Sequence, residues 1–260
     1  MNPKSGSPES VTMSPPDLPG ATLPTAIART SATAWSWRAE LAQFLAFLRR
    51  PRRRAVCKQA TFGEKLPRLL FLLALNAVLV LPVMLVIDSL SKWAGVEEII
   101  TRTPSLQEFL MIAFIVPIVE ELLFRAGLRS FTYTLLVGPV LICCTLGSYI
   151  VTTIMIAWAL MLWLMFRWQS SRSGLQRARQ FLRYYPAVFW LYVMAFGMVH
   201  TQNHATSSWA GLLLLPLTNI SQMLGAMMMG YLRLRNGLSM SIAFHMCWNA
   251  GCMMALWLLA

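Results

Sequence analysis

Long apolar segments separated by short polar or basic stretches dominate the chain after Lys65. Residues 69–87 contain 19 consecutive positions without a charged side chain, and residues 131–166 contain 36. Residues 184–232 contain 49 such positions, and residues 236–260 contain 25 more. Because a helix needs about 20 predominantly apolar residues to cross a bilayer, this pattern predicts an all-α, polytopic transmembrane helical bundle.

The breaks between these segments predict about six to eight crossings. The least distinct break is inside residues 131–166, where the helix breakers are Gly138, Pro139, Gly147 and Ser148. The expected spanning segments are residues 68–90, 106–126, 130–147, 149–167, 185–206, 209–231 and 238–259. We therefore expect one transmembrane domain over residues 66–260 and no soluble domain.

The region before this domain differs from it in composition. Residues 1–34 are rich in Ser, Pro, Thr and Ala, which predicts a disordered tail. Residues 35–48 predict a short amphipathic helix, and five arginines follow between residues 49 and 54. This pairing suits an anionic membrane surface, and a plain positive-inside flank explains it equally well. We treat residues 1–65 as a disordered basic N-terminal region that contains this helix.

Composition and charge support a membrane protein and argue against a nucleic-acid-binding protein. Hydrophobic residues make up 57% of the chain and charged residues 12%, whereas soluble domains carry about 25% charged residues. The net charge of +12 comes mainly from short Lys and Arg clusters between apolar segments. By the positive-inside rule, these clusters predict a cytoplasmic N-terminus, with the mixed 88–108 loop outside and the Arg-rich 167–183 loop inside. Seven crossings would then leave the C-terminus outside. The five cysteines show neither C-x-x-C nor zinc-knuckle spacing, so we expect no disulfide framework.

Two adjacent carboxylates, Glu120 and Glu121, lie inside an apolar segment, and no Asp or Glu follows them in the rest of the chain. Ionisable groups within a membrane are costly and mostly functional. The three histidines, His200, His204 and His245, also lie in or beside apolar segments. Polar residues around His204 indicate that the chain reaches the membrane interface there, so we set His204 aside.

Helical spacing sorts the remaining candidates into pairs. Glu121 and Arg125 are four residues apart, so they can form an ion pair on one face. Glu120 is rotated by about 100° from Glu121 and can face a cavity instead. The same spacing of four residues places Phe196 next to His200 and places His245 next to Asn249.

These residues supply a carboxylate, two imidazoles and an amide from three segments. Hydrolysis of an amide bond needs a base that activates water and donors that stabilise the oxyanion. Glu120 could be the base, and His and Asn could be the donors. Alternatively, Glu120, His200 and His245 could bind zinc, which accepts two His and one carboxylate plus water. The sequence leaves zinc and a metal-free site both open.

Three motifs together resemble those of the CPBP intramembrane proteases, the CAAX protease and bacteriocin-processing (Abi) family. The motifs are Glu120-Glu121-x-x-x-Arg125, Phe196-x-x-x-His200 and His245-x-x-x-Asn249. The resemblance covers about residues 105–255 and implies an all-helical membrane fold with a catalytic cavity between helices.

The resemblance also implies a role for each site residue. Glu120 would activate water, and His200 would help to position it. His245 and Asn249 would stabilise the oxyanion, while Glu121, Arg125 and Phe196 would support the site. The expected activity is an endopeptidase of the bacterial plasma membrane. Its partners would be membrane lipids and a peptide or protein substrate, of the prenylated CAAX type or the bacteriocin type.

The long stretch between Glu120 and His200 strains this topology. Two full crossings within residues 130–167 would place these two side chains toward opposite sides of the membrane. They can meet only near the middle of the membrane, or if one segment is re-entrant. Two other functions compete with the protease: a non-catalytic bacteriocin-immunity or scaffold protein, and a proton-coupled transporter that uses Glu and His as a relay.

Overall fold

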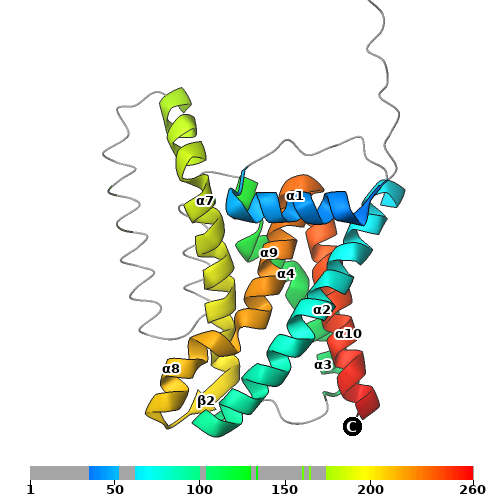
Figure 1. The fold of residues 1–260 in the computed structure, drawn as a ribbon, viewed down its shortest axis with the longest axis vertical. Coiled ribbons are helices and arrows are strands. Elements are labelled where there is room, and N and C mark those ends of the chain that lie inside the picture. The colour runs from blue at the N-terminus through cyan, green and yellow to red at the C-terminus, as the bar shows by residue number, and fades with distance from the viewer. Residues whose placement is uncertain are drawn as a thin grey trace, which may run out of the picture. The chain divides into compact units, whose positions relative to one another are not determined.

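Helices make up nearly all of the structure, which is a computed structural model (Figure 1). It describes residues 35–52, 62–99, 104–129 and 174–259 and the single residues Tyr133, Leu160 and Leu164. The long helices are α2 (Phe62–Ala94), α7 (Gly174–Val199), α9 (Ile220–Arg235) and α10 (Leu238–Leu259). The all-α prediction is confirmed. The predicted segments 130–147 and 149–167 lie outside the described residues, apart from those three single positions.

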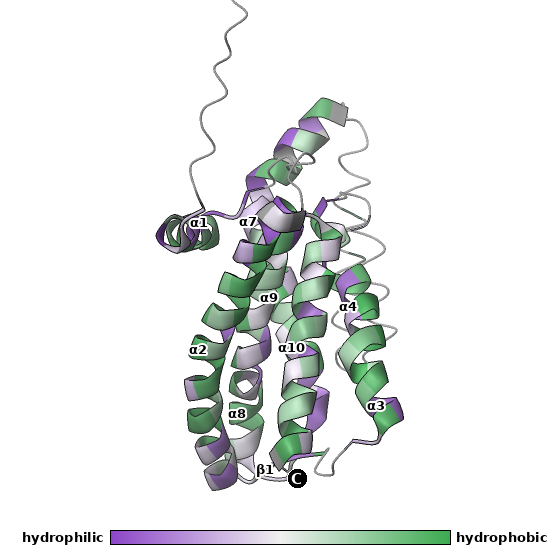
Figure 2. Cartoon of the chain, turned by 90° about the vertical axis from the view of Figure 1, so that its right-hand side faces the viewer, coloured by the Kyte–Doolittle hydropathy of each residue, from purple (hydrophilic) through white to green (hydrophobic). Residues whose placement is uncertain are grey.

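Three helical stretches within the described ranges are long and apolar enough to cross a membrane: Lys65–Ala94, Phe181–Asn203 and Trp209–Arg235. Hydrophobic residues dominate α2 (Figure 2), and some of its apolar side chains are exposed, since Val78 and Leu85 are 67% and 72% exposed. Soluble monomers rarely expose extended apolar patches. These helices indicate membrane association, and the number of crossings, six to eight, stays a prediction.

The segment with the two adjacent glutamates is helical, but it is not one regular α-helix. It begins as α3 (Leu106–Leu110), widens into the π-helix η1 (Met111–Ile115) and continues as α4 (Val116–Phe124). Pro117 has no backbone N–H and cannot donate the α-helical hydrogen bond to the preceding turn. A π turn at this point accommodates the missing bond. A short 3-10 helix, η2 (Gly127–Arg129), follows.

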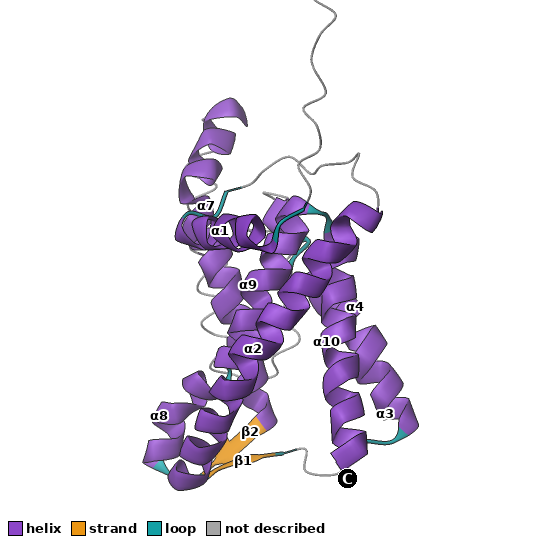
Figure 3. Ribbon diagram, turned by 45° about the vertical axis from the view of Figure 1, so that its right-hand side comes forward, coloured by secondary structure: helices purple, strands orange, loops and turns teal. Residues whose placement is uncertain are grey.

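Two short strands connect the ends of α2 and α7 (Figure 3). Strand β1 (Val96–Glu98) pairs antiparallel with β2 (His204–Thr206), and Glu98 lies opposite His204. The 3-10 helix η4 (His200–Asn203) joins α7 to β2. His204 therefore lies just beyond the apolar stretch, as the polar residues around it indicated.

One predicted loop and one predicted spanning segment need correction. Helix α7 begins at Gly174, so the prediction of a loop over residues 167–183 is wrong from that residue on. The Leu, Gln, Arg and Ala residues of this stretch favour a helix, and α7 extends through them. The predicted segment 209–231 is divided at Asn219 into α8 (Trp209–Thr218) and α9, and α9 continues to Arg235.

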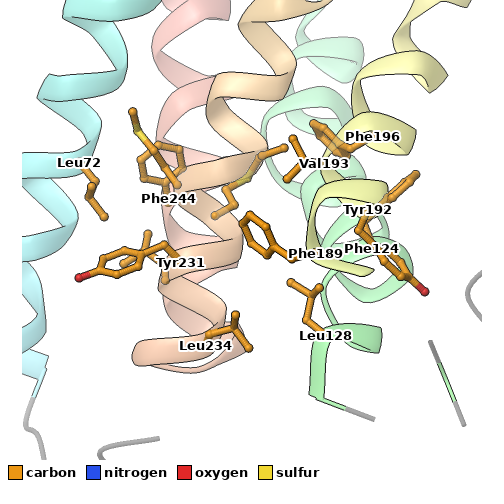
Figure 4. Close-up of a cluster of buried hydrophobic side chains, with 14 of the residues drawn as sticks. Leu72, Phe124, Leu128, Phe189, Tyr192, Val193, Phe196, Tyr231, Leu234 and Phe244 are labelled. Carbon is orange, nitrogen blue, oxygen red and sulfur yellow. The ribbon is translucent and has the colours of Figure 1, made fainter. Parts of the chain in front are cut away.

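Aromatic side chains fill the centre of the bundle (Figure 4). Phe189 of α7 is fully buried, and its ring contacts the backbone of α9 at Gly230. A Cβ atom at Gly230 would lie 2.6 Å from the Phe189 ring, so the close approach of α7 and α9 requires glycine there. Gly237, with φ of +104°, forms the tight turn between α9 and α10.

Helix α1 (Trp37–Arg49) lies across one end of the bundle, over α2 and α9 (Figure 1). Its Phe44 is buried against Tyr231 of α9. The helix predicted at residues 35–48 is thus confirmed. The compact unit begins at Trp35, so α1 belongs structurally to the bundle, although the predicted domain boundary lies at residue 65. Residues 1–34 lie outside the described part of the chain.

Candidate active site

Glu120 of α4 lies between two histidines from other elements. The Glu120 Oε1 atom is 3.8 Å from Nε2 of His200, the first residue of η4. Its Oε2 atom is 3.4 Å from Nε2 of His245 on α10. Three segments far apart in the sequence therefore bring one carboxylate and two imidazoles together, which spacing within each helix could not predict. The Glu120 side chain is 18% exposed, so the carboxylate is not sealed inside the bundle.

The other ring nitrogen of each histidine has an acceptor that orients the ring. His200 Nδ1 lies 2.7 Å from the Phe196 carbonyl oxygen, one helical turn earlier. His245 Nδ1 lies 3.2 Å from Glu121 Oε1. A carbonyl and a carboxylate only accept hydrogen bonds, so both Nδ1 atoms carry the hydrogen. Both histidines then present Nε2 to Glu120.

Glu121 is fully buried and is held by three side chains. Its Oε1 atom lies 3.3 Å from Arg125 Nε and also accepts from His245, and its Oε2 atom accepts from the Ser241 hydroxyl. Arg125 is itself 3% exposed. The predicted ion pair is present, and Glu121 differs from Glu120 in having a permanent cation beside it.

Phe196 forms the apolar wall of the site. Its ring centroid lies 4.7 Å from that of His200 and 5.8 Å from that of His245. The Arg125 guanidinium carbon lies 3.9 Å from the same ring centroid, on the face where a cation is attracted. One aromatic ring thus contacts both histidines and the arginine, a wider role than the predicted contact with His200.

Asn249 does not contact the carboxylates. Its Nδ2 atom donates to the carbonyl oxygen of Ile112 in the π-helix, at 3.1 Å. A side-chain amide nitrogen carries two hydrogens, so one N–H remains for another acceptor. Asn249 lies one turn after His245 on α10, as its spacing predicted, and it links α10 to the segment that carries Glu120.

Sequence reasoning missed Ser241 as a member of this site. Ser241 is four residues before His245, and its hydroxyl also contacts the Met229 carbonyl oxygen at 2.9 Å. The signal was present: Ser241, His245 and Asn249 recur every four residues along one helical face. A hydroxyl in an apolar helix is common, however, and its bond to Glu121 depends on how α10 packs against α4.

The predicted zinc alternative used Glu120, His200 and His245. Zinc ligands bind at about 2.0–2.2 Å from the metal. Within the described ranges, no group of three or more His, Cys, Asp or Glu side chains is arranged to hold a metal ion. The zinc alternative therefore gains no support from this arrangement and stays a prediction, and the chemistry below uses the side chains alone.

Comparison with known proteins identifies no relative. No protein-family model matches the chain, and neither a curated protein nor a solved structure matches it.

Proposed function

We propose that the chain is an intramembrane endopeptidase of the CPBP type, which hydrolyses a peptide bond of a membrane-associated substrate. One observation carries the proposal: both oxygens of Glu120 face an imidazole Nε2 atom, while Glu121 is held by Arg125 and Ser241. Adjacent acids in such different surroundings take different roles, one chemical and one structural.

In the proposed reaction, Glu120 accepts a proton from a water molecule and the hydroxide oxygen attacks the peptide carbonyl carbon. His200 holds the water near the carboxylate, because its Nε2 atom is the free hydrogen-bonding group of an oriented ring. Collapse of the tetrahedral intermediate breaks the C–N bond, and the leaving amine takes the proton that Glu120 accepted.

The oxyanion needs donors within the same space. Asn249 has one N–H beyond the bond to Ile112. His245 can donate from Nε2 when that atom holds a hydrogen, and Glu121 lies beside its Nδ1 atom and orients the ring. Arg125 neutralises Glu121 and contributes no atom to the reaction.

The membrane orientation is part of the proposal. One end of the bundle carries Arg49 at the end of α1, Arg50 and Arg52 just after it, and Arg233 and Arg235 of α9 (Figure 1). At the other end, Glu97 and Glu98 lie in β1. By the positive-inside rule, the α1 end faces the cytoplasm of a bacterial plasma membrane. The substrate would be a prenylated CAAX-type or a bacteriocin-type peptide.

The decisive test replaces Glu120 by Gln and compares the new protein N-termini that appear in membranes of cells expressing each form. Loss of the base lowers the cleavage rate by roughly 10²–10⁴-fold. Glu97→Gln is the matched control, because it is the same substitution at an exposed glutamate outside the helices. We expect that variant to cleave like the wild type.

Thermal unfolding in detergent distinguishes loss of chemistry from loss of fold. Glu120→Gln should unfold at the wild-type temperature. Cleavage that persists in a folded Glu120→Gln protein would rule out the mechanism. A folded Glu120→Gln protein that still rescues a deletion phenotype would instead favour the scaffold function.

A further inference from the structure

A basic cavity lies between α1 and the last turns of α9, away from the candidate active site. It has a volume of about 280 Å³, near the lower end of small-ligand pockets, which span about 300–1,000 Å³. Its lining residues are Gln43, Ala46, Phe47, Arg50, Arg52, Tyr231, Leu234 and Arg235. This volume suits a small headgroup and is too small for a folded partner.

Three arginines are among the described residues that line this cavity, and no acidic residue is among them. Arg50, Arg52 and Arg235 have no carboxylate within ion-pair distance among the side chains that the structure describes. The nearest buried acid of α1, Glu40, is already bonded to Arg68 and Tyr231. Among the described side chains the positive charge of the cavity is therefore uncompensated, and Arg is well suited to bind phosphate oxygens.

Apolar side chains form part of the remaining cavity wall, and α1, which supplies two of them, carries exposed tryptophans at its other end. These side chains are Ala46, Phe47 and Leu234. At the start of α1, Trp35 and Trp37 are 41% and 51% exposed. Exposed tryptophans and a basic flank characterise helices at the level of lipid headgroups. A ligand here would combine an anionic group with an apolar body.

We propose that this cavity binds the phosphate headgroup of an anionic phospholipid. The guanidinium groups of Arg52 and Arg235 bind the phosphate oxygens, and Phe47 and Leu234 contact the apolar part next to the glycerol. Basic pockets at the ends of membrane helices bind anionic headgroups through the same combination of charge and shape. The inference is independent of the proposed protease activity, because its evidence lies at α1 and α9.

The test measures lipid binding to the full chain in detergent, by native mass spectrometry with phosphatidylglycerol and with zwitterionic phosphatidylcholine. We expect phosphatidylglycerol to bind preferentially. Arg52→Gln and Arg235→Gln should each weaken its binding by about fivefold, the effect of one basic residue near an anionic surface. Arg49→Gln is the matched control, because Arg49 is an exposed neighbour on α1 that does not line the cavity.

Three results would overturn the proposal. Equal binding of the two lipids would show that the cavity does not recognise negative charge. An equal loss in Arg49→Gln and Arg52→Gln would show that only a diffuse basic surface attracts lipid. Full displacement of phosphatidylglycerol by inorganic phosphate at equal concentration would identify a soluble phosphate as the ligand. Thermal unfolding of each variant checks that the bundle remains folded.

Discussion

Two carboxylates of this bundle, Glu40 and Glu120, have opposite surroundings. Glu40 of α1 is 2% exposed, and its Oε1 atom lies 2.7 Å from Arg68 Nε and 2.5 Å from the Tyr231 hydroxyl oxygen. Glu120 is partly exposed, and its nearest charged or titratable partners are imidazoles at 3.4 and 3.8 Å. Glu40 has short bonds to a permanent cation and a phenol, whereas Glu120 faces groups that can gain and lose a proton.

Burial alone therefore does not identify a catalytic acid, because the two carboxylates differ in the groups that face them. A carboxylate with a permanent cation at short distance holds helices together through that ion pair. A carboxylate that faces oriented imidazoles and retains some exposure can exchange protons with water. By this criterion Glu121 resembles Glu40, because Arg125 lies beside it and Ser241 donates to it.

Glu121→Ala should produce the largest loss of stability among the substitutions of these three acids. It would leave the buried Arg125 cation without its partner, which costs about 3–5 kcal/mol. Glu120→Ala should cost less than about 1 kcal/mol, because it removes only longer contacts to histidines near a surface-accessible position. Unfolding of both variants by denaturant in detergent micelles measures the two free energies.

A conservative substitution of Glu121 should also affect cleavage. Glu121→Gln keeps the shape of the side chain and weakens the orientation of His245, so we expect reduced cleavage in the fraction that folds. Equal destabilisation by Glu120→Ala and Glu121→Ala would contradict the distinction between the two neighbouring acids.

Glu40→Gln should have a smaller effect on stability, of about 1–3 kcal/mol. Arg68 remains 14% exposed and can reach water when its partner is lost, and it also bonds Asn236 at 3.1 Å. Because Glu40 attaches α1 to α2 and α9, amide hydrogen exchange within α1 should accelerate in this variant. Cleavage should stay at the wild-type rate. A loss of cleavage as severe as that of Glu120→Gln would contradict the distinction between a structural Glu40 and a catalytic Glu120.

Local relations within one helix were predictable from the sequence, and relations between helices were not. The spacing of four residues correctly predicted the Glu121–Arg125 pair and the contact of Phe196 with His200. Charge-free runs likewise predicted most of the helices, since length and composition alone decide whether a segment can be buried in lipid. The first part of α7 was predicted incorrectly as a loop because its residues are charged, and charge does not prevent a helix.

The missed contacts all depend on packing between distant segments. Tyr231 bonds Glu40 across 191 positions, and Ser241 bonds Glu121 across 120. Each of these side chains also has an ordinary explanation in its own helix, so no local pattern distinguishes it. The bond from Asn249 to Ile112 further requires the π turn before Pro117, which the predicted regular helix did not include.

The smallest predicted effect concerns His204, which lies just beyond the apolar stretch that ends at Asn203. Partial burial lowers the pKa of His204, nearby His200 lowers it further, and Glu98 on the paired strand opposes the shift. The folded state therefore binds a proton less readily at His204 than the unfolded state does. Stability from this residue is present above the unfolded pKa of about 6.5 and is lost as the pH falls through the folded pKa.

Acidification from about pH 7.5 to 5.5, across that ordinary value, should lower the unfolding temperature of the wild type more than that of His204→Gln. The effect should be modest because His204 is only partly buried and solvent screens its charge. His204→Gln should also keep the cleavage rate of the wild type, because His204 pairs with β1, whereas His200 and His245 face Glu120. If His204→Gln abolished cleavage while His200→Gln did not, the assignment of the two histidines would have to be exchanged.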